Sequence, residues 1–444
     1  MTIFDVFLIP LYLAIFYFLA RRTVSANYND PLYRIYYMKG LNYKFIGTFA
    51  FTFIYLFYYK GGDTLEYFYA ARPMIKLLII DPIWYFKFIT GIYNHYPEYL
   101  GYDISASQGV YLTHGSATLT TIRIASVLAI VCCNSFVVVS LAFAYICYQF
   151  VWRAFRLMVS LYPVLHKQLA FAFLMIPSVL FWGSGIGKDT VMLGAIMLIF
   201  YCYYMIFIRK NIRAKYVLFF LVAMYTTALI RGFILFTIIP CLMLMTVVYY
   251  QKQIKSSMLR FLVGPIILAG GLGASVFFVK SLGDSVESYK IDSLAKKAEG
   301  FRSWHTTLNK YEGGSGYTIG ENFSYTPMGV LTHSPIAAAI ALFGPFPWQI
   351  RNAVMLLSGI ESLAFLYFTI KIIFNKRIYK LASVLSGDPI IVFCIPFTLI
   401  LAVAIGLTSF NYGSLVRYKI PVLPFFAVSI ILINYHLDKK SPAR

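Results

Sequence analysis

The chain has 444 residues, of which 60% are hydrophobic and 12% are charged, and its mean hydropathy is +0.73. Soluble globular proteins carry about 25% charged residues, so this composition excludes a soluble enzyme, a disordered chain and a collagen-like repeat. The six cysteines all lie in apolar stretches and show no metal-ligand spacing. The net charge of +21 would indicate nucleic-acid binding in a soluble chain, and its distribution tests that interpretation.

A membrane-spanning helix needs about 20 mostly apolar residues. Eleven segments fit, so the sequence predicts an all-α polytopic membrane protein whose residues 1–444 form a single transmembrane domain. No small-residue cleavage site follows the first segment, and we expect a retained helix rather than a signal peptide. Two shorter apolar stretches, residues 122–133 and 335–348, are expected to be re-entrant or interfacial. The eleven segments are residues 3–20, 43–59, 135–152, 168–183, 190–208, 216–230, 232–250, 261–279, 354–374, 389–409 and 420–434.

The distribution of Lys and Arg predicts the orientation, because cytoplasmic loops of membrane proteins are enriched in both. With the N-terminus outside and the C-terminus inside, the inner connections hold 22 basic and three acidic residues, a net charge of +19. The outer connections are nearly balanced, at +3. Membrane topology therefore accounts for most of the positive charge, and no nucleic-acid partner is needed to explain it.

The acidic residues and the unusual polar motifs fall almost entirely on the predicted outer side. Two long outer loops, residues 60–122 and 280–353, are rich in aromatic residues rather than in residues typical of disorder. Loops longer than about 12–15 residues are usually functional or disordered. We therefore expect these loops to form an ordered outer layer with interfacial or re-entrant helices.

The first motif, KGGDTLEY at residues 60–67, follows the second predicted span. Asp63 and Glu66 would share one face of a helix, where they could act as a general base or metal ligand, or simply as a helix cap. Arg72, one or two turns later, is a candidate partner for these acids or for a phosphate.

The second motif, PSVLFWGSGIGKDT at residues 177–190, resembles a nucleotide-binding P-loop only superficially. That motif requires a Gly where this chain has Trp182, and Asp189 replaces the Ser or Thr that would contact magnesium. We interpret the segment as a glycine-rich turn whose backbone N–H groups, with Lys188, bind an anion at the start of the next helix. The alternative is a tight turn with a Lys188–Asp189 ion pair.

Several charged residues stand alone in apolar surroundings. Arg351 and Arg417 lie at predicted outer helix ends, where they could bind a phosphate or simply extend toward lipid headgroups. Arg231 separates two spans with almost no loop, which favours a functional role. Glu361 lies within the ninth span, where an isolated charge costs about 2.5–3.5 kcal/mol, so we expect it to pair with a loop arginine.

This layout resembles the GT-C superfamily of polytopic membrane glycosyltransferases, and also the related polymerases and ligases of bacterial surface polysaccharides. The resemblance in layout covers the whole chain, but few residues match the family's motifs. The matching residues are Asp63 and Glu66 in the first outer loop and Arg417 in RYKIPVLP at residues 417–424. In the family these acids follow the first span, whereas in this chain they follow the second predicted span.

The resemblance implies transfer of a sugar from a polyprenyl phosphate or diphosphate carrier to a glycan or lipid acceptor at the outer face of a bacterial inner membrane. Asp63 would act as the base, with Glu66 orienting it or helping a divalent cation such as Mg²⁺ or Mn²⁺. Trp84, Trp304 and Trp348 would offer stacking faces for sugar rings. The residues implied for phosphate binding are Arg72, Lys188, Arg231 and Arg417.

Two other classes remain open. A transporter or flippase for a lipid-linked glycan would place functional polar residues deep within the spans. A structural scaffold would leave the outer acids without a basic pocket. An enzyme requires Asp63, Lys188, Arg231 and Arg417 to converge in one outward cavity.

Overall fold

The computed structural model describes residues 3–92, 115–251, 315–320, 323–351 and 353–438, with scattered positions between 266 and 307. These residues form helices and their connections, and none forms a strand beyond one isolated bridge between Gly316 and Asn411. The all-α prediction is thus confirmed for the described part of the chain.

Seven helices of the described chain are long and apolar enough to cross a membrane, and a bent pair, Tyr412–Tyr418 and Leu423–Asp438, turns through 67° and would make eight. Apolar helices of this length are typical of an integral membrane protein. The seven apolar helices are α1 (Ile3–Asn27), α8 (Phe136–Leu161), α11 (Lys188–Tyr203), α12 (Ala214–Arg231), α13 (Phe233–Tyr250), α17 (Ala353–Ile373) and α19 (Pro389–Gly406). Two further long helices are α2 (Pro31–Phe53) and α21 (Leu423–Asp438).

Shorter helices connect or cover the long ones. π-Helical turns extend α2 through Ile54–Tyr59 (η1) and α11 through Tyr204–Ile208 (η4). The shorter helices are α3 (Asp63–Ala71), α4 (Met74–Ile80), α5 (Pro82–Thr90), α7 (Gly115–Val131), η3 (Pro163–Leu165), α9 (His166–Leu174), α10 (Pro177–Trp182), α16 (Pro327–Phe343), η7 (Pro347–Gln349), η8 (Ile378–Lys380), α18 (Leu381–Gly387) and α20 (Tyr412–Tyr418).

The structure differs from the sequence predictions in two places. Residues 168–183 do not form one helix, because Pro177 lacks an N–H and holds Ile176 in an extended conformation between α9 and α10. The apolar stretches at 122–133 and 335–348 belong to α7 and α16, which start seven and eight residues earlier than predicted. Most of the span predicted at 261–279 lies outside the described residues.

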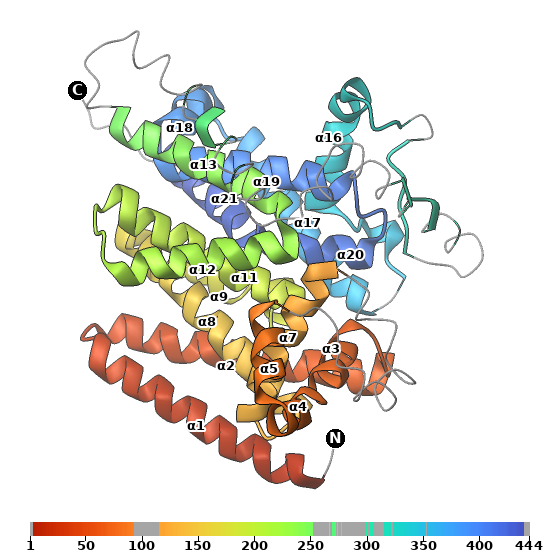
Figure 1. The fold of residues 1–444 in the computed structure, drawn as a ribbon. Helices are drawn as coiled ribbons and strands as arrows, with labels where there is room; N and C mark the ends of the chain where they lie inside the picture. The colour runs from red at the N-terminus through yellow and green to blue at the C-terminus, as the bar shows by residue number, and fades with distance from the viewer. Residues whose placement is uncertain are drawn as a thin grey trace.

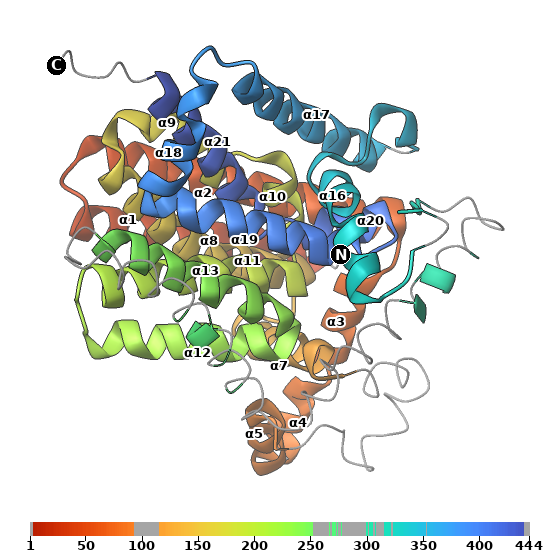
Figure 2. The ribbon, with the colours of Figure 1, turned by 90° about the horizontal axis from the view of Figure 1, so that it is seen from above.

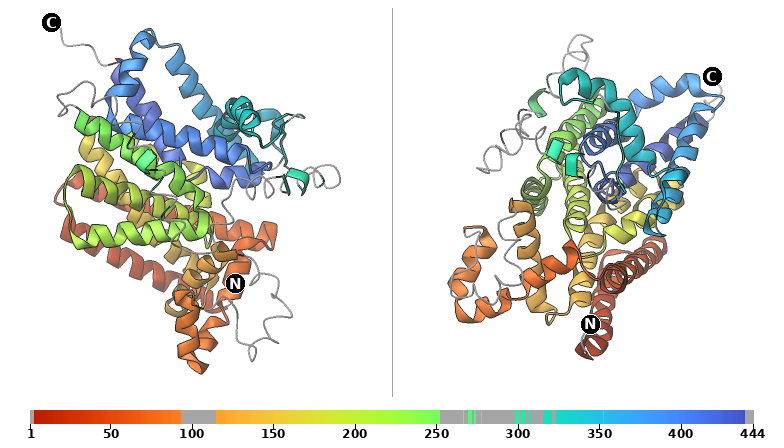
Figure 3. Two further views of the ribbon diagram at one scale, coloured as in Figure 1. Left: turned by 45° about the horizontal axis from the view of Figure 1, so that its top comes forward. Right: turned by 90° about the vertical axis from the view of Figure 1, so that its right-hand side faces the viewer.

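The long helices lie side by side, and their contacts run from α12 through α13, α19 and α21 to α17 (Figure 2). α11 packs against both α8 and α12. The short helices α3, α4, α5 and α20 gather at one end of this bundle (Figure 1), and the orange helices α3 to α5 project from its side (Figure 3, right). We call this end the α3 end, and the opposite end, where α8 ends and α18 lies, the α18 end.

Two buried charges hold the short helix α10 in place from opposite sides. Glu361 of α17 accepts hydrogen bonds from the backbone N–H and the Oγ–H of Ser178, at 2.8 and 2.6 Å, in the first turn of α10. Lys44 of α2 donates to the carbonyl of Gly183, which ends α10. An anion at the N-terminus and a cation at the C-terminus both match the helix dipole. The prediction that Glu361 pairs with an arginine is therefore wrong, because the backbone N–H and the hydroxyl of Ser178 at the start of α10 satisfy the carboxylate instead.

Replacing Glu361 by Ala should destabilise the protein by about 2–3 kcal/mol, since two hydrogen bonds to a buried carboxylate are lost. Glu361→Gln, which keeps an acceptor oxygen, should cost less. Thermal unfolding of the purified protein in detergent measures both. Equal stability of Glu361→Ala and the unmodified protein would show that α10 does not depend on this contact.

Candidate functional site

Four charged side chains from four separate helices form a connected network at the α3 end. Asp189 of α11 contacts Arg231 at the end of α12, with 2.5 Å between its Oδ1 and the guanidinium Nη2. Its other oxygen, Oδ2, accepts from Nε of Arg417 in α20 at 2.9 Å. Arg417 also reaches Oδ2 of Asp63, the first residue of α3, at 3.1 Å. Asp189 thus ties together segments up to 228 residues apart in the sequence.

Asp189 owes its position to the glycine-rich turn that precedes α11. Gly187 is the N-cap of α11, so Asp189 lies in the first helical turn, where a carboxylate is favoured by the helix dipole. Gly185 packs directly on Phe51 of α2, and a Cβ at this position would lie 1.9 Å from the ring. The turn can therefore approach α2 only because residue 185 has no side chain.

Arg231 is buried, with a relative exposure of 8%, and its guanidinium lies 4.2 Å from the ring centroid of Tyr418. Only one residue, Gly232, separates α12 from α13, which keeps Arg231 away from bulk water. Its Nη1 is buried without a hydrogen-bond partner in the described part of the chain. Buried donors are rarely left unpaired in native proteins, so this atom is suited to a ligand's oxygen.

Arg417 and Asp63 are the more accessible members of the network. The side chain of Asp63 is 50% exposed and that of Arg417 is 22% exposed. The guanidinium of Arg417 also lies over Trp182, 5.6 Å from its ring centroid. Gly62, just before α3, has a φ of 100°, a conformation that favours glycine and that turns the chain into α3 at Asp63.

Lys188 lies beside the network but makes its own contacts. Its ammonium donates to Oγ1 of Thr118 in α7 at 2.9 Å and lies 5.5 Å from the ring centroid of Tyr67 in α3. Burial, and secondly the neighbouring Asp63 carboxylate, raise the pKa of Tyr67, which therefore stays a neutral phenol. The alternative of a Lys188–Asp189 ion pair is not observed, because Asp189 is fully engaged by the two arginines.

The other predicted site residues do not join these contacts. Glu66 is half-buried one turn after Asp63, and Arg72 is exposed beyond the last turn of α3. Arg351 is exposed after η7, and Glu361 is committed to α10. In the described residues, no three His, Cys, Asp or Glu side chains stand close enough to hold a metal ion.

The structure also adds residues that the sequence analysis did not select. Trp182 and Tyr418 each present a ring to an arginine of the network, and both lie within motifs found in the sequence, where they were not assigned a role. Thr118, in contrast, carries no signal in the sequence, because an isolated threonine in an apolar helix has no recognisable pattern.

The sum of these charges favours an anion. Lys188, Arg231 and Arg417 provide three positive charges against the two carboxylates of Asp63 and Asp189. Comparison of the chain with protein-family models, with curated proteins and with solved structures finds no match. Its function must therefore be inferred from the geometry.

Gly185→Ala should destabilise the protein, because the new methyl group would overlap the Phe51 ring and force the turn away from α2. Gly187→Ala is the matched control: the backbone there is extended, and a Cβ would meet no atom closer than 4.0 Å. Thermal unfolding of both variants measures the difference. Equal melting temperatures would contradict the close approach of the turn to Phe51.

Asp189→Ala should cost about 3–5 kcal/mol, because it leaves the buried Arg231 without a counter-charge. Asp63→Ala should have little effect on stability, since Asp63 is half exposed and its ion pair is weakened by solvent. Denaturation of the two purified variants side by side checks this contrast. If the two losses were equal, Asp189 would not be the organising residue of the network.

Proposed function

We propose that this network is the active site of a membrane glycosyltransferase that moves a sugar or glycan from a polyprenyl phosphate or diphosphate to an acceptor hydroxyl. The observation that carries the proposal is the convergence of one accessible carboxylate, Asp63, with Lys188, Arg231 and Arg417 at one end of the helices. A general base and an excess of positive charge are the two elements that this reaction requires.

In the proposed reaction, Asp63 accepts the proton of the acceptor hydroxyl as the hydroxyl oxygen bonds to the anomeric carbon of the sugar. The bond between that carbon and the carrier's phosphate oxygen breaks, and its electron pair stays on the phosphate. Arg417 and Lys188 stabilise the negative charge that develops there. Asp189 contacts no substrate in this scheme and positions the two arginines.

An apolar cavity next to the network supports a lipid-linked donor. It has a volume of about 220 Å³, lies between α7, α8, α11 and α12, and includes Thr190, the residue after Asp189. Its other lining residues are almost all apolar, among them Phe143, Phe150 and Leu198. A polyprenyl phosphate needs this combination, because its charged head and its hydrocarbon chain require adjacent polar and apolar surroundings.

The buried charges within the helices favour this enzyme over a transporter or flippase. Lys44 and Glu361 hold the two ends of α10, and Lys419 donates to the Gly344 carbonyl at the end of α16. Each of them satisfies a helix terminus rather than lining a path between the two ends of the bundle. A polymerase or ligase would use the same site, with a growing glycan as one of its substrates.

We place the α3 end on the outer, periplasmic face of a bacterial inner membrane, because the basic residues concentrate at the opposite end. Eleven spans result if four further segments each cross the membrane once in addition to the seven apolar helices. The four segments are α2 with η1, the broken α9–α10 pair, residues 261–279 and the bent α20–α21 pair. In this arrangement the exposed Trp348, stacked on Phe346 at 5.2 Å, also faces outward. Glu66, Arg72 and a divalent cation remain predictions of the sequence.

Asp63→Asn should lower sugar transfer at least 100-fold, because the amide cannot accept the proton. Purified protein in lipid nanodiscs is incubated with radiolabelled polyprenyl-linked sugars and acceptor glycans, and products are separated by size, which also distinguishes single transfer from polymerisation. Full transfer by Asp63→Asn would exclude Asp63 as the base.

Two further variants distinguish loss of the base Asp63 from a loss of folding or of carrier binding. Asp81→Asn, at the N-cap of α5 on the same side of the protein, should keep full activity, because Asn also caps helices. Lys188→Gln should weaken binding of the carrier diphosphate, measured by titration with a short-chain polyprenyl diphosphate, whereas Asp63→Asn should leave this binding near normal.

A further inference from the structure

A second cavity, lined by many polar side chains, lies at the α18 end, far from the network of Asp189. Its volume is about 460 Å³, within the range of small-molecule binding sites. α11 and its extension η4 run for 21 residues between the two places, so the helix rise separates them by roughly 30 Å, the thickness of the hydrocarbon core. The cavity therefore opens at the opposite membrane surface.

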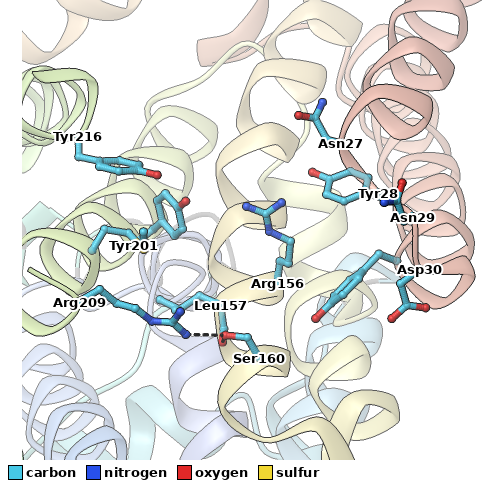
Figure 4. A pocket seen from close by; sticks show the side chains of 12 residues that line it. Asn27, Tyr28, Asn29, Asp30, Arg156, Leu157, Ser160, Tyr201, Arg209 and Tyr216 are labelled. Carbon is cyan, nitrogen blue, oxygen red and sulfur yellow. Dashed lines mark hydrogen bonds between the residues drawn. The ribbon is translucent and has the colours of Figure 1, made fainter. Parts of the chain in front are cut away.

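The walls of this cavity come from four parts of the chain (Figure 4). The turn between α1 and α2 faces the end of α8, while the end of α11 with η4 and the start of α12 close the other side. The lining residues are Asn27, Tyr28, Asn29, Asp30, Tyr33, Arg156, Leu157, Ser160, Tyr201, Met205, Arg209 and Tyr216.

Two guanidinium groups give the cavity its chemistry. Arg156 points into the space between Tyr28 and Tyr201, and Arg209 reaches Oγ of Ser160 at 3.3 Å (Figure 4). None of the ion pairs in the described part of the chain involves either arginine. The one carboxylate of the lining, Asp30, is engaged as the N-cap of α2, accepting from Leu32 N–H at 2.8 Å. The cavity thus carries more positive than negative charge.

The surroundings hold Arg156 in position before any ligand arrives. Its guanidinium lies 5.3 Å from the ring centroid of Tyr28. Tyr28 is itself fixed, because its hydroxyl accepts from the Trp152 indole at 2.8 Å and its carbonyl accepts from Arg34 Nε at 2.7 Å. A guanidinium fork that is already ordered loses little entropy when it binds phosphate oxygens in a bidentate manner.

We propose that this cavity binds a phosphate group at the inner membrane surface, with Arg156 and Arg209 as its ligands and the surrounding Tyr and Asn side chains as additional donors. The phosphate belongs either to a lipid headgroup or to a soluble phosphate ester, because both present the same oxygens. This site is separate from the proposed transferase site and does not depend on it.

Binding to the purified full-length protein tests the proposal, with dihexanoyl phosphatidic acid and glycerol 3-phosphate as probes and isothermal titration calorimetry as the measurement. Arg156→Gln and Arg209→Gln should each weaken binding at least tenfold, and Arg156→Lys should recover only part of it, since the bidentate fork is lost. Arg153→Gln is the matched control on the same helix; Arg153 donates to the Gln149 carbonyl and lies outside the cavity, so binding should be unchanged.

Tighter binding of the short-chain lipid than of glycerol 3-phosphate would identify a lipid headgroup site, and equal binding would identify a site for soluble phosphate esters. The proposal is overturned if neither probe binds, or if Arg153→Gln weakens binding as much as Arg156→Gln does. Because Arg209 is exposed, its variant keeps the test valid even if Arg156→Gln fails to fold.

Discussion

The buried carboxylate of Asp189 is the constraint on which the α3 end of the protein depends. It is almost fully removed from solvent, yet it holds two arginines that come from α12 and α20. An unpaired buried charge is strongly destabilising, so each of these three side chains requires the others. Through Arg417 the same network reaches Asp63, and this places the accessible carboxylate of α3 beside the positive charges.

A similar principle supports the frame around the network. Lys44, Glu361 and Lys419 are buried, and each contacts the unpaired backbone groups at an end of a short or broken helix. In an apolar environment the backbone N–H and C=O groups at a helix end need hydrogen-bond partners, and a buried charge needs polar partners as well. Each of these contacts satisfies both groups. The glycine-rich turn before α11 is consequently fixed from α2, α10 and α17 together, which suits a site that must hold its geometry at the membrane surface.

The two cavities lie at opposite ends of the helices and differ in the chemistry of their lining residues. At the α3 end a smaller apolar cavity adjoins a network of carboxylates and guanidinium groups, the combination on which the proposal of a lipid-linked donor rests. At the α18 end a wider polar cavity offers arginines without ion-paired acids, which fits binding rather than proton transfer. α11 and its extension η4 connect the two, because Asp189 lies in the first turn of α11 and Arg209 follows η4.

Apolar length, glycine spacing and isolated charges are local properties, so the sequence was enough to predict the helical membrane class and the glycine-rich turn, and to select Asp63, Lys188, Arg231 and Arg417 as candidates. It misplaced the partner of Glu361 and missed the break before Pro177 and the contact of Lys188 with Thr118. That Asp189 joins two arginines, and that Arg72 stays outside the network, followed from the packing of the helices and could not be predicted. An isolated charge within an apolar segment can be recognised from the sequence as needing a partner. The identity of that partner depends on which helices pack together, which is not a local property.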